Sequence, residues 1–203
     1  MGLHNYRPIS KISYLFKILK CVVNSQLHTH LDHFSLLSPL QSAFCPLFST
    51  ETAVLKVSSE IMDAADKGQL TLLGLFNLSA AFDTVDHLTL LQSLCNSAGI
   101  SGTALSWFSS YLSTRSAQVF WKASTSDPIS LEHGVPQGSG LGPLLFLIYT
   151  IGIDSIFSRH NFHAHMYADD IQAYAHCPSS EQSHVSRDAQ RNCWIICPHG
   201  GSY

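Results

Sequence analysis

Two adjacent carboxylates, Asp169 and Asp170, are the side chains of this sequence with the most evident chemistry. Apolar and polar residues alternate on both sides of the pair, over residues 162–167 and again over residues 171–174. Alternation with a period of two on either side of a short turn predicts a β-hairpin with both carboxylates at its tip. Carboxylates held together on a turn repel each other, and a divalent cation that binds them relieves the repulsion. An ordinary acidic surface turn is the alternative for an isolated Asp-Asp pair.

A glycine-rich segment at residues 134–142 is the second candidate, and Pro143 after it predicts the start of a helix. Glycines let a ligand approach the backbone closely, while Gln137 and Ser139 offer hydrogen-bond donors. The start of a helix favours bound anions, because its first backbone N–H groups have no partner within the helix. The segment therefore suits a phosphate group.

The third candidate lies where an apolar run, residues 70–78, ends in polar side chains. Asn77 stands at this end, and Phe82 and Asp83 follow a stretch of small residues that allows a close turn. A strand end, a glycine-rich loop before a helix and a carboxylate turn thus follow one another along the chain. In that order they suit a nucleotide phosphate held by metal ions.

The sequence pattern around these residues predicts helices and strands that together make an α/β (α+β) fold. Helices are expected at residues 12–33, 49–67, 86–98, 101–112 and 143–151, and strands at residues 70–78, 117–121, 129–133, 162–167 and 171–176. The run at 70–78 is apolar nearly throughout, which predicts a central strand buried on both faces. We expect a small, mainly antiparallel sheet with helices packed on one of its faces.

Composition narrows the classes of protein to which the chain can belong. A hydrophobic fraction of 45% supports a substantial core and excludes wholesale disorder. Lys and Arg number only 11 and the net charge is −3, so any contact with nucleic acid must be local. The cysteines are scattered, no signal peptide is seen, and the longest apolar run, residues 142–153, is too short to span a bilayer. We therefore expect an intracellular protein, cytoplasmic or nuclear, without a membrane partner.

Three ordered motifs resemble the palm motifs of reverse transcriptases, specifically those of non-LTR (LINE-type) retrotransposons. They are NLSAAFDTVDH at residues 77–87, GVPQGSGLGP at residues 134–143 and YADD at residues 167–170. Residues 5–10, 41–44 and 49–52 are similar to the fingers motifs of the same enzymes. The resemblance covers residues 5–177, and the order of the three motifs makes it specific.

The resemblance implies the fingers and palm of a right-hand polymerase, without the thumb. Residues 1–68 would form a fingers-like helical region, residues 69–177 a palm-like core, and residues 178–203 a polar tail without regular structure. It also implies RNA-directed DNA synthesis, with an RNA template, a DNA primer and a deoxynucleoside triphosphate (dNTP) as partners. Mg²⁺ or Mn²⁺ would be the cofactor, with one ion activating the primer 3′-hydroxyl and a second neutralising the leaving pyrophosphate.

By resemblance, Asp169 matches a catalytic metal ligand, Asp170 its acidic neighbour, and Leu78 a position whose backbone carbonyl lies at the metals. Asn77 stands where the family has its first catalytic aspartate. An asparagine offers a neutral amide oxygen where the site needs an anionic ligand shared by two cations. Loss of that ligand should cost several kcal/mol of transition-state stabilisation, at about 1.4 kcal/mol for each tenfold in rate. We therefore expect impaired catalysis.

For the nucleotide, Phe82 matches the bulky residue that excludes a ribose 2′-hydroxyl, and Gln137 and Gly138 match positions that line the nucleotide and template. Cys45 is a further departure, because the family has a phosphate-gripping arginine there. The sequence also ends before the later palm motifs and the thumb, which adds to the expected impairment. The alternatives are a non-catalytic remnant that still binds nucleic acid, and an unstable product of a decayed element.

Three further groups of residues leave alternatives open. Four basic residues could contact a template from the fingers side, or they could simply be solvated surface charges: Arg7, Lys11, Lys17 and Lys20. Four residues have spacings that could suit a zinc site, although the sequence around them shows no framework of turns to hold one: Cys177, Cys193, Cys197 and His199. His163 and His165 alternate on the strand before the carboxylates, where hydrogen-bonded or solvated histidines are a simpler interpretation than metal ligands.

Overall fold

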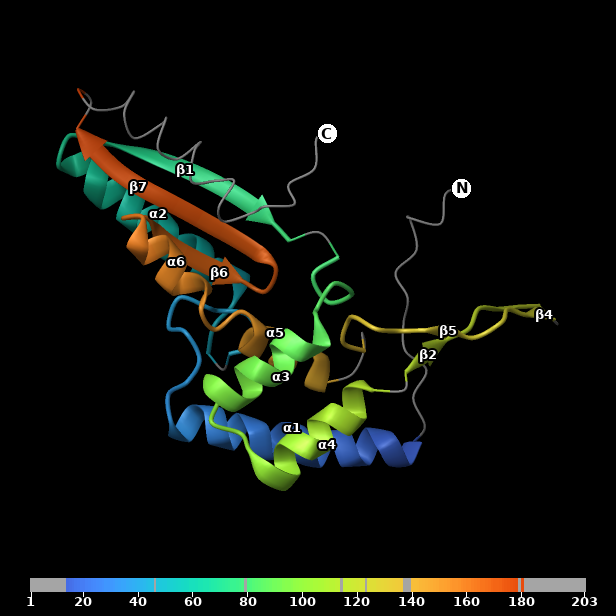
Figure 1. Cartoon of the computed structure of the whole chain (residues 1–203). Helices are drawn as coiled ribbons and strands as arrows, with labels where there is room; N and C mark the ends of the chain where they lie inside the picture. Colours follow the sequence, from blue (N-terminus) through green and yellow to red (C-terminus); the bar gives the residue numbers. More distant parts are fainter. Residues whose placement is uncertain are drawn as a thin grey trace. The chain divides into compact units, whose positions relative to one another are not determined.

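The computed structural model describes residues 14–45, 47–78, 80–113, 115–122, 124–136, 140–178 and 180. These residues form helices and small antiparallel sheets in two compact units (Figure 1). One unit takes residues 38–79 and 152–203, and the other takes residues 1–37 and 80–151.

The expected division into a fingers-like region at 1–68 and a palm-like core at 69–177 is based on the motifs, and its boundaries differ from those of the two units. That division stays a prediction. The polar tail beyond residue 180, the fingers motif at residues 5–10 and part of the glycine-rich segment lie outside the described residues.

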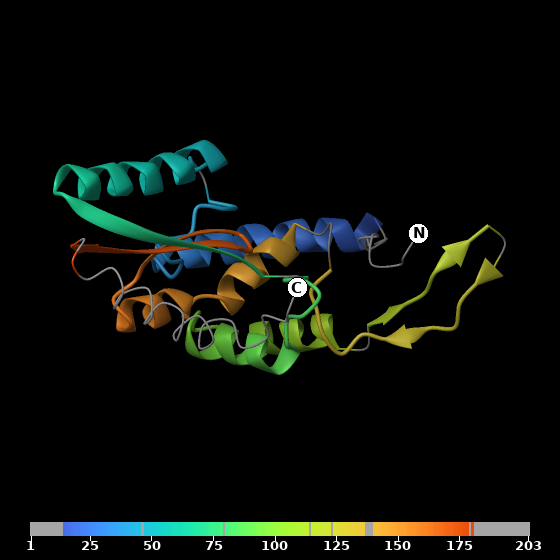
Figure 2. The same ribbon diagram turned by 90° about the horizontal axis from the view of Figure 1, so that it is seen from above.

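A three-stranded antiparallel sheet organises the unit of residues 38–79 and 152–203. Its strands, in spatial order, are β1 (Gln69–Asn77), β7 (Asp170–Pro178) and β6 (His163–Tyr167). Two helices, α2 (Thr50–Asp66) and α6 (Ile153–Arg159), lie on opposite faces of this sheet (Figures 1 and 2). The expected mixture of helices with a small antiparallel sheet is confirmed, whereas the expectation of helices on one face is wrong.

The two faces of the sheet differ in chemistry, because successive side chains of a strand point to opposite sides. The face toward α6 is apolar, with a core of Phe157, Ala164, Met166, Ile171 and Ala173 against which Leu40, Phe76, Leu78, Ile153 and Phe162 pack. The face toward α2 is polar and aromatic, and there the Tyr174 hydroxyl donates a 2.6 Å hydrogen bond to Glu60 of α2. A helix can therefore pack on each face.

Local signals set the bounds of α2. Ser49 caps its first turn by accepting a hydrogen bond from the Thr52 backbone N–H, while the Thr52 hydroxyl accepts one from the Ser49 N–H. This reciprocal capping box satisfies two N–H groups that a helix start leaves without partners. Beyond the other end, Gly68 has a φ of +70°, a conformation that ends helices and that glycine adopts without strain.

β1 lies at the edge of the described sheet, so the expectation of a central strand buried on both faces is wrong. Its leucines reach solvent, and Leu75 is 72% exposed. β7 takes the central place and is buried over most of its length. A continuous apolar run indicates a strand, but the order of strands depends on long-range pairing that the run does not encode.

Four helices pack together in the described part of the unit of residues 1–37 and 80–151. They are α1 (Tyr14–His33), α3 (His87–Asn96), α4 (Gly102–Leu112) and α5 (Leu141–Tyr149). α5 contacts both α1 and α3, and all but two of its residues are buried. A helix that is hydrophobic all round belongs in the interior, and α5 is the centre of this unit.

A two-stranded arm extends from the same unit (Figure 2). In it β2 (Ser116–Ala117) pairs with β5 (Ile129–Ser130), and β3 (Phe120–Trp121) pairs with β4 (Ser124–Thr125). The strands expected at residues 117–121 and 129–133 are thus broken into short ladders. Val119 and Ile129 are exposed on the arm, so these two side chains add little to a core.

One stretch among the described residues, Leu141–Arg159, is long and apolar enough to cross a membrane by length and composition. The apolar run of residues 142–153, expected to be too short to span a bilayer, lies within this stretch. The stretch consists of α5 and α6, which are separated by residues 150–152. Because core helices of globular proteins meet the same criterion and α5 is buried, the stretch is only weak support for a membrane span.

Candidate active site

The two carboxylates lie where β6 turns into β7. Tyr167 and Asp170 are partners across this hairpin, so Ala168 and Asp169 form a two-residue loop. Asp169 therefore lies in the loop, whereas Asp170 opens β7, and only the first carboxylate stands at the tip. Ala168 has a φ of +56°, a left-handed conformation that costs a non-glycine residue about 1–2 kcal/mol. Two-residue hairpin loops favour such positive φ values.

The end of β1 meets this hairpin. Asn77 pairs with Asp170 in the β1–β7 register, and its Nδ2 donates a 2.7 Å hydrogen bond to Asp170 Oδ1. One residue further, the Leu78 N–H donates to the carbonyl oxygen of Asp169 at 3.0 Å. The predicted convergence of residue 77 with the acidic pair is therefore confirmed, while the catalytic and metal-binding roles of these residues stay predictions.

Two carboxylates and one amide make up the donor set at this point. An ionised carboxylate only accepts hydrogen bonds, so the amide nitrogen of Asn77 is the atom that faces Asp170. That bond occupies a carboxylate oxygen that a cation would otherwise use. Among the described residues, no group of three or more His, Cys, Asp or Glu side chains is placed to hold a metal ion. These described residues offer two carboxylates, and they lack the further shared anionic ligand that a pair of divalent cations requires.

The polar face of the sheet holds buried histidine and tyrosine side chains. His165 is 1% exposed, and its Nε2 makes a 2.9 Å hydrogen bond with Ser42 Oγ. His163 stacks on the ring of Tyr174, with 5.5 Å between ring centroids. Burial, followed by the hydrogen bond and charge of Glu60, raises the pKa of Tyr174. The interpretation of His165 as a hydrogen-bonded histidine is confirmed.

Acid is expected to destabilise the fold through His165 as the pH falls from about 7.5 to about 5.5. Burial, and then the charge of Lys56, lowers the pKa of His165, against a smaller opposing effect of Glu60. Protonation would also place a proton on Nδ1, a buried atom with no hydrogen-bond partner among the described residues. The folded-state pKa lies below that of the unfolded chain, about 6.5, so the unfolded state binds more protons in this window. Urea-unfolding midpoints measured across the window check this.

His165→Gln should flatten that pH dependence, whatever its effect on the midpoint at neutral pH. His33→Gln, at an exposed position in α1, is the matched control and should leave the slope unchanged. A residual slope is expected, because burial also lowers the pKa of His176. An undiminished slope in His165→Gln would contradict the prediction.

Phe82 belongs to the unit of residues 1–37 and 80–151. Its ring packs on Phe146 of α5, with 5.0 Å between ring centroids. The backbone N–H of Val135 donates a 2.7 Å hydrogen bond to the Phe82 carbonyl oxygen. The turn that carries Phe82 is thereby held against the start of the glycine-rich segment.

Gly134 joins these two segments most closely. Its N–H donates to the Val85 carbonyl oxygen at 2.8 Å, and its φ is +85°. A Cβ at this position would lie 2.9 Å from the Asp83 carbonyl oxygen and 3.0 Å from the Asp83 Cα. Backbone atoms cannot move aside as a flexible side chain can, so only glycine fits.

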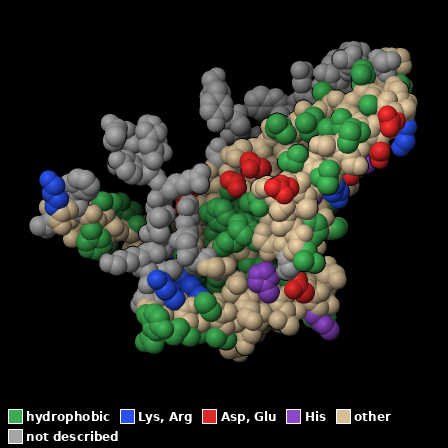
Figure 3. All heavy atoms as spheres, turned by 180° about the vertical axis from the view of Figure 1, so that it is seen from behind, with side chains coloured by type: hydrophobic (Ala, Val, Ile, Leu, Met, Phe, Trp, Pro, Cys, Tyr) green, Lys and Arg blue, Asp and Glu red, His purple; other side chains and the backbone are tan. Residues whose placement is uncertain are grey.

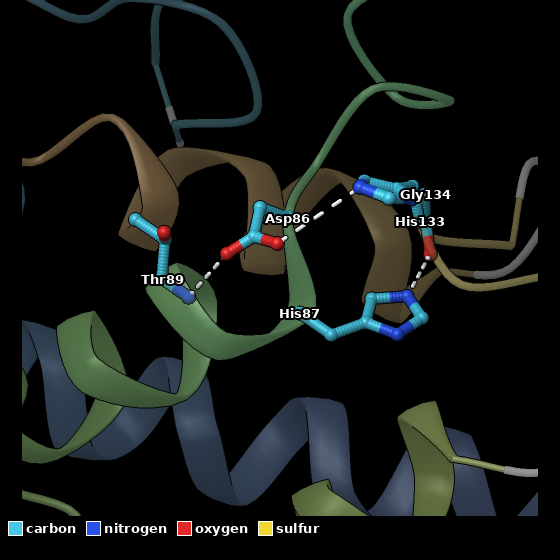
Figure 4. A network of polar contacts seen from close by, with 5 residues as sticks. All are labelled: Asp86, His87, Thr89, His133 and Gly134. Atoms are coloured by element: carbon cyan, nitrogen blue, oxygen red, sulfur yellow. Dashed lines mark hydrogen bonds and ion pairs between the residues drawn. The ribbon is translucent and has the colours of Figure 1, made fainter.

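Two side chains hold the carbonyl group of Gly134, and Figure 4 shows one of them, His87. His87 Nε2 lies 2.9 Å from its oxygen, and Arg115 donates to the same oxygen at 2.6 Å. The carbonyl oxygen can only accept, so Nε2 of His87 carries a proton. Sequence reasoning missed Arg115, because it lies in an irregular segment outside the three motifs.

Asp86 begins α3 beside this carbonyl group. It accepts a 2.7 Å hydrogen bond from the Thr89 N–H as the N-cap of α3, and its Oδ2 lies 4.0 Å from His133 Nε2 (Figure 4). The hydrogen bonds from Thr89, and then His133 and His87, lower the pKa of Asp86. The expected start of a helix at Asp86 is confirmed.

Lys20, a candidate for contact with the template, lies in the interior of its unit. Lys20 is buried, 4% exposed, with its ammonium group 5.0 Å from the ring centroid of Phe16 and 5.1 Å from that of Tyr111. Burial, and then the charge of Arg115, lowers the pKa of Lys20 to about 8. The interpretation of Lys20 as a residue that contacts the template is therefore wrong.

Gln137 and Gly138, predicted to line the nucleotide and template, lie outside the described residues. Of the four possible zinc ligands, only Cys177 is described, and it is buried in β7. On the face drawn in Figure 3, the described Lys and Arg side chains are few and scattered. That distribution agrees with a low content of basic residues.

Comparisons with known proteins identify the family of the chain. The family model for reverse transcriptase (RNA-dependent DNA polymerase) matches residues 2–192. The chain is 30% identical over 174 residues to a probable RNA-directed DNA polymerase from transposon BS of Drosophila melanogaster, covering 82% of this chain and 19% of that protein. It is 25% identical over 146 residues to a probable RNA-directed DNA polymerase from transposon X-element of the same organism, covering 72% of this chain and 16% of that protein. The chain thus spans less than a fifth of these curated relatives.

Among solved structures, a partial Cas6-RT-Cas1–Cas2 complex matches with a TM-score of 0.33 and 22% sequence identity, over 73% of this chain and 26% of that chain. A second Cas6-RT-Cas1–Cas2 complex matches with the same TM-score and identity, over 16% of its own chain. The family assignment depends on the sequence matches, which extend over nearly the whole chain. The chain belongs to the reverse transcriptase (RNA-dependent DNA polymerase) family and is a reverse transcriptase domain of the retrotransposon type.

Proposed function

We propose that this chain is the fingers and palm region of a retrotransposon RNA-directed DNA polymerase that binds template and primer but extends the primer poorly. The observation that carries the proposal is the 2.7 Å hydrogen bond from Asn77 Nδ2 to Asp170 Oδ1. Reverse transcriptases generally use divalent metal ions. Here an uncharged amide stands where such ions require a shared anion, and its N–H group competes with them for Asp170.

In this proposal Asp169 and Asp170 are the remaining anionic ligands for Mg²⁺ or Mn²⁺. The hydrogen bond between the Leu78 N–H and the Asp169 carbonyl oxygen keeps the end of β1 against the hairpin, which supports a role for the Leu78 carbonyl beside the ions. Asn77 adds no negative charge to this group. Charge on the ions and on the reacting phosphate would therefore be poorly balanced, which reduces electrostatic stabilisation of the transition state.

Phe82 is proposed to exclude a ribose 2′-hydroxyl, with Gln137 and Gly138 lining the nucleotide and template. The contact of the Phe82 ring with Phe146 supports the first role, because a residue that selects by shape must itself be held in place. An RNA template, a DNA primer and a dNTP are the proposed partners.

Primer extension on a homopolymeric RNA template, with millimolar Mg²⁺ or Mn²⁺, tests the proposal. The wild-type chain is expected to extend primers no better than the Asp169→Asn variant, which lacks a proposed ligand. Robust extension by the wild type that is lost in Asp169→Asn would contradict the proposed impairment. It would show that the amide at residue 77 suffices.

A non-catalytic nucleic-acid-binding remnant is the second candidate, and the same amide at residue 77 favours it. A filter-binding titration against salt measures this function directly, since each neutralised phosphate contributes about −0.9 to the log–log slope. Only 11 Lys and Arg residues are present, so a shallow slope of roughly −2 to −4 is expected. Affinity for template–primer that does not change with salt would contradict both candidate functions.

A further inference from the structure

The side chain of Gln41 is hydrogen bonded to the loop of the carboxylate hairpin. Its Oε1 accepts from the backbone N–H of Ala168 at 3.0 Å and from that of Ala43 at 3.0 Å, and its Nε2 lies 3.5 Å from the Ala168 carbonyl oxygen. Gln41 is 5% exposed. One buried amide thus reaches both backbone polar groups of a single loop residue.

Backbone pairing fixes the segment that carries Gln41. The Met166 N–H donates to the Leu40 carbonyl oxygen at 2.8 Å, and the Ser42 N–H donates to the Met166 carbonyl oxygen at 2.9 Å. This forms a parallel bridge between Gln41 and Met166, on the side of β6 that faces away from β7. Gln41 is thus fixed beside Met166, and Met166 lies two residues before Ala168 in the chain.

The contact bears on the strained residue of the loop. Ala168 has a φ of +56°, a conformation that an alanine adopts only when its surroundings stabilise it. The Gln41 amide provides that stabilisation, because it satisfies the Ala168 N–H without a partner from either strand. The conformation of Ala168 in turn sets where Asp169 lies relative to Asp170.

We propose that Gln41 is a positioning residue that holds Ala168 in its left-handed conformation and so presents Asp169 and Asp170 as a pair beside residue 77. We call the hydrogen bonds between the Gln41 side chain and Ala168 the clamp. Its relevance to DNA synthesis rests on the proposed function. The hydrogen bonds described above for the Gln41 side chain all go to backbone groups, so Gln41 acts through the hairpin.

Backbone amide hydrogen exchange, measured by NMR on the whole chain, tests the clamp without any need for activity. Gln41→Met keeps the length of the side chain and removes its hydrogen bonds. It is expected to speed exchange of the Ala168 N–H at least tenfold while exchange in the β1–β7 ladder, at Leu72 for example, stays within twofold. Gln92→Met, at an exposed position in α3, is the matched control and should change neither. Unchanged protection of Ala168 in Gln41→Met would overturn the proposal.

A second substitution separates positioning from general packing. Glycine adopts a φ of +56° without strain, so Ala168→Gly should make the loop less dependent on the clamp. The loss of thermal stability caused by Gln41→Met is then expected to shrink in an Ala168→Gly background. An equal loss in both backgrounds would mean that Gln41 contributes packing alone, and the proposal fails.

Primer extension in an Asn77→Asp background distinguishes this proposal from the proposed function. If Asn77→Asp extends primers, Gln41→Met is expected to lower its kcat more than it raises its KM for dNTP, and an unchanged kcat would overturn the positioning role. If Asn77→Asp is inactive while the exchange and rescue results hold, the clamp stands and the proposed function fails.

Discussion

Asn77→Asp is expected to make the stability of the chain depend on divalent cations. In EDTA the variant should melt lower than the wild type by roughly 2–6 °C, because a carboxylate replaces the amide that donates to Asp170 and two like charges then face each other. In millimolar Mn²⁺ the order should reverse, since three carboxylates form a binding site that cations stabilise by mass action. Thermal melts with and without Mn²⁺ measure both effects.

The same substitution is expected to produce the largest gain in activity. An anionic ligand at residue 77 restores the charge that two cations share, and losses of single electrostatic groups in active sites change rates by about 10²–10³. We therefore expect primer extension by Asn77→Asp on the order of a hundred-fold or more above the wild type. Mn²⁺ affinity should rise roughly ten- to hundred-fold, as judged from the effects of substitutions around metal sites.

Two controls isolate the added charge. Asn77→Ala removes the hydrogen bond to Asp170 without adding a carboxylate, so it should lower the melting temperature in EDTA and show no recovery with Mn²⁺. Asn96→Asp adds a charge at an exposed position of α3 and should respond little to either condition. If Asn77→Asp melts at the same temperature in EDTA and in Mn²⁺, residue 77 does not belong to a metal site.

Gly134→Ala is expected to cause the largest loss of stability of any single methyl addition among the described glycines. Its φ of +85° costs an alanine about 1–2 kcal/mol. The added Cβ would also lie within 3.0 Å of two backbone atoms of Asp83, and relief of such overpacking costs about 1–3 kcal/mol. We expect a total loss of about 2–5 kcal/mol in the free energy of unfolding, measured by urea denaturation.

Other glycines of the same unit provide matched controls for this prediction. Gly99 has a φ of +67° with nothing within 4 Å of an added Cβ, so Gly99→Ala should show the conformational cost alone. Gly140 has a φ of −57° and open space around it, so Gly140→Ala should be neutral or stabilising. Equal effects of Gly134→Ala and Gly99→Ala would mean that the contact with Asp83 can relax freely.

The sequence by itself determined those features that depend on residues close together in the chain. The alternation before and after the Asp-Asp pair correctly predicts the β6–β7 hairpin, because side chains of a strand alternate whatever lies around them. The capping box at Ser49 and Thr52 likewise sets the start of α2 within four residues. The reverse transcriptase motifs also depend on residue order alone, and the family matches agree with them.

Tertiary structure decided which of these local elements meet. The hydrogen bond between Asn77 and Asp170 joins residues 93 positions apart, and the contact of Gln41 with Ala168 spans 127. The same is true of the edge place of β1 and the burial of Lys20, both of which sequence reasoning predicted wrongly. Strand order and the environment of a side chain result from competition among many distant contacts for a shared core. No pattern within a few residues encodes the outcome of that competition.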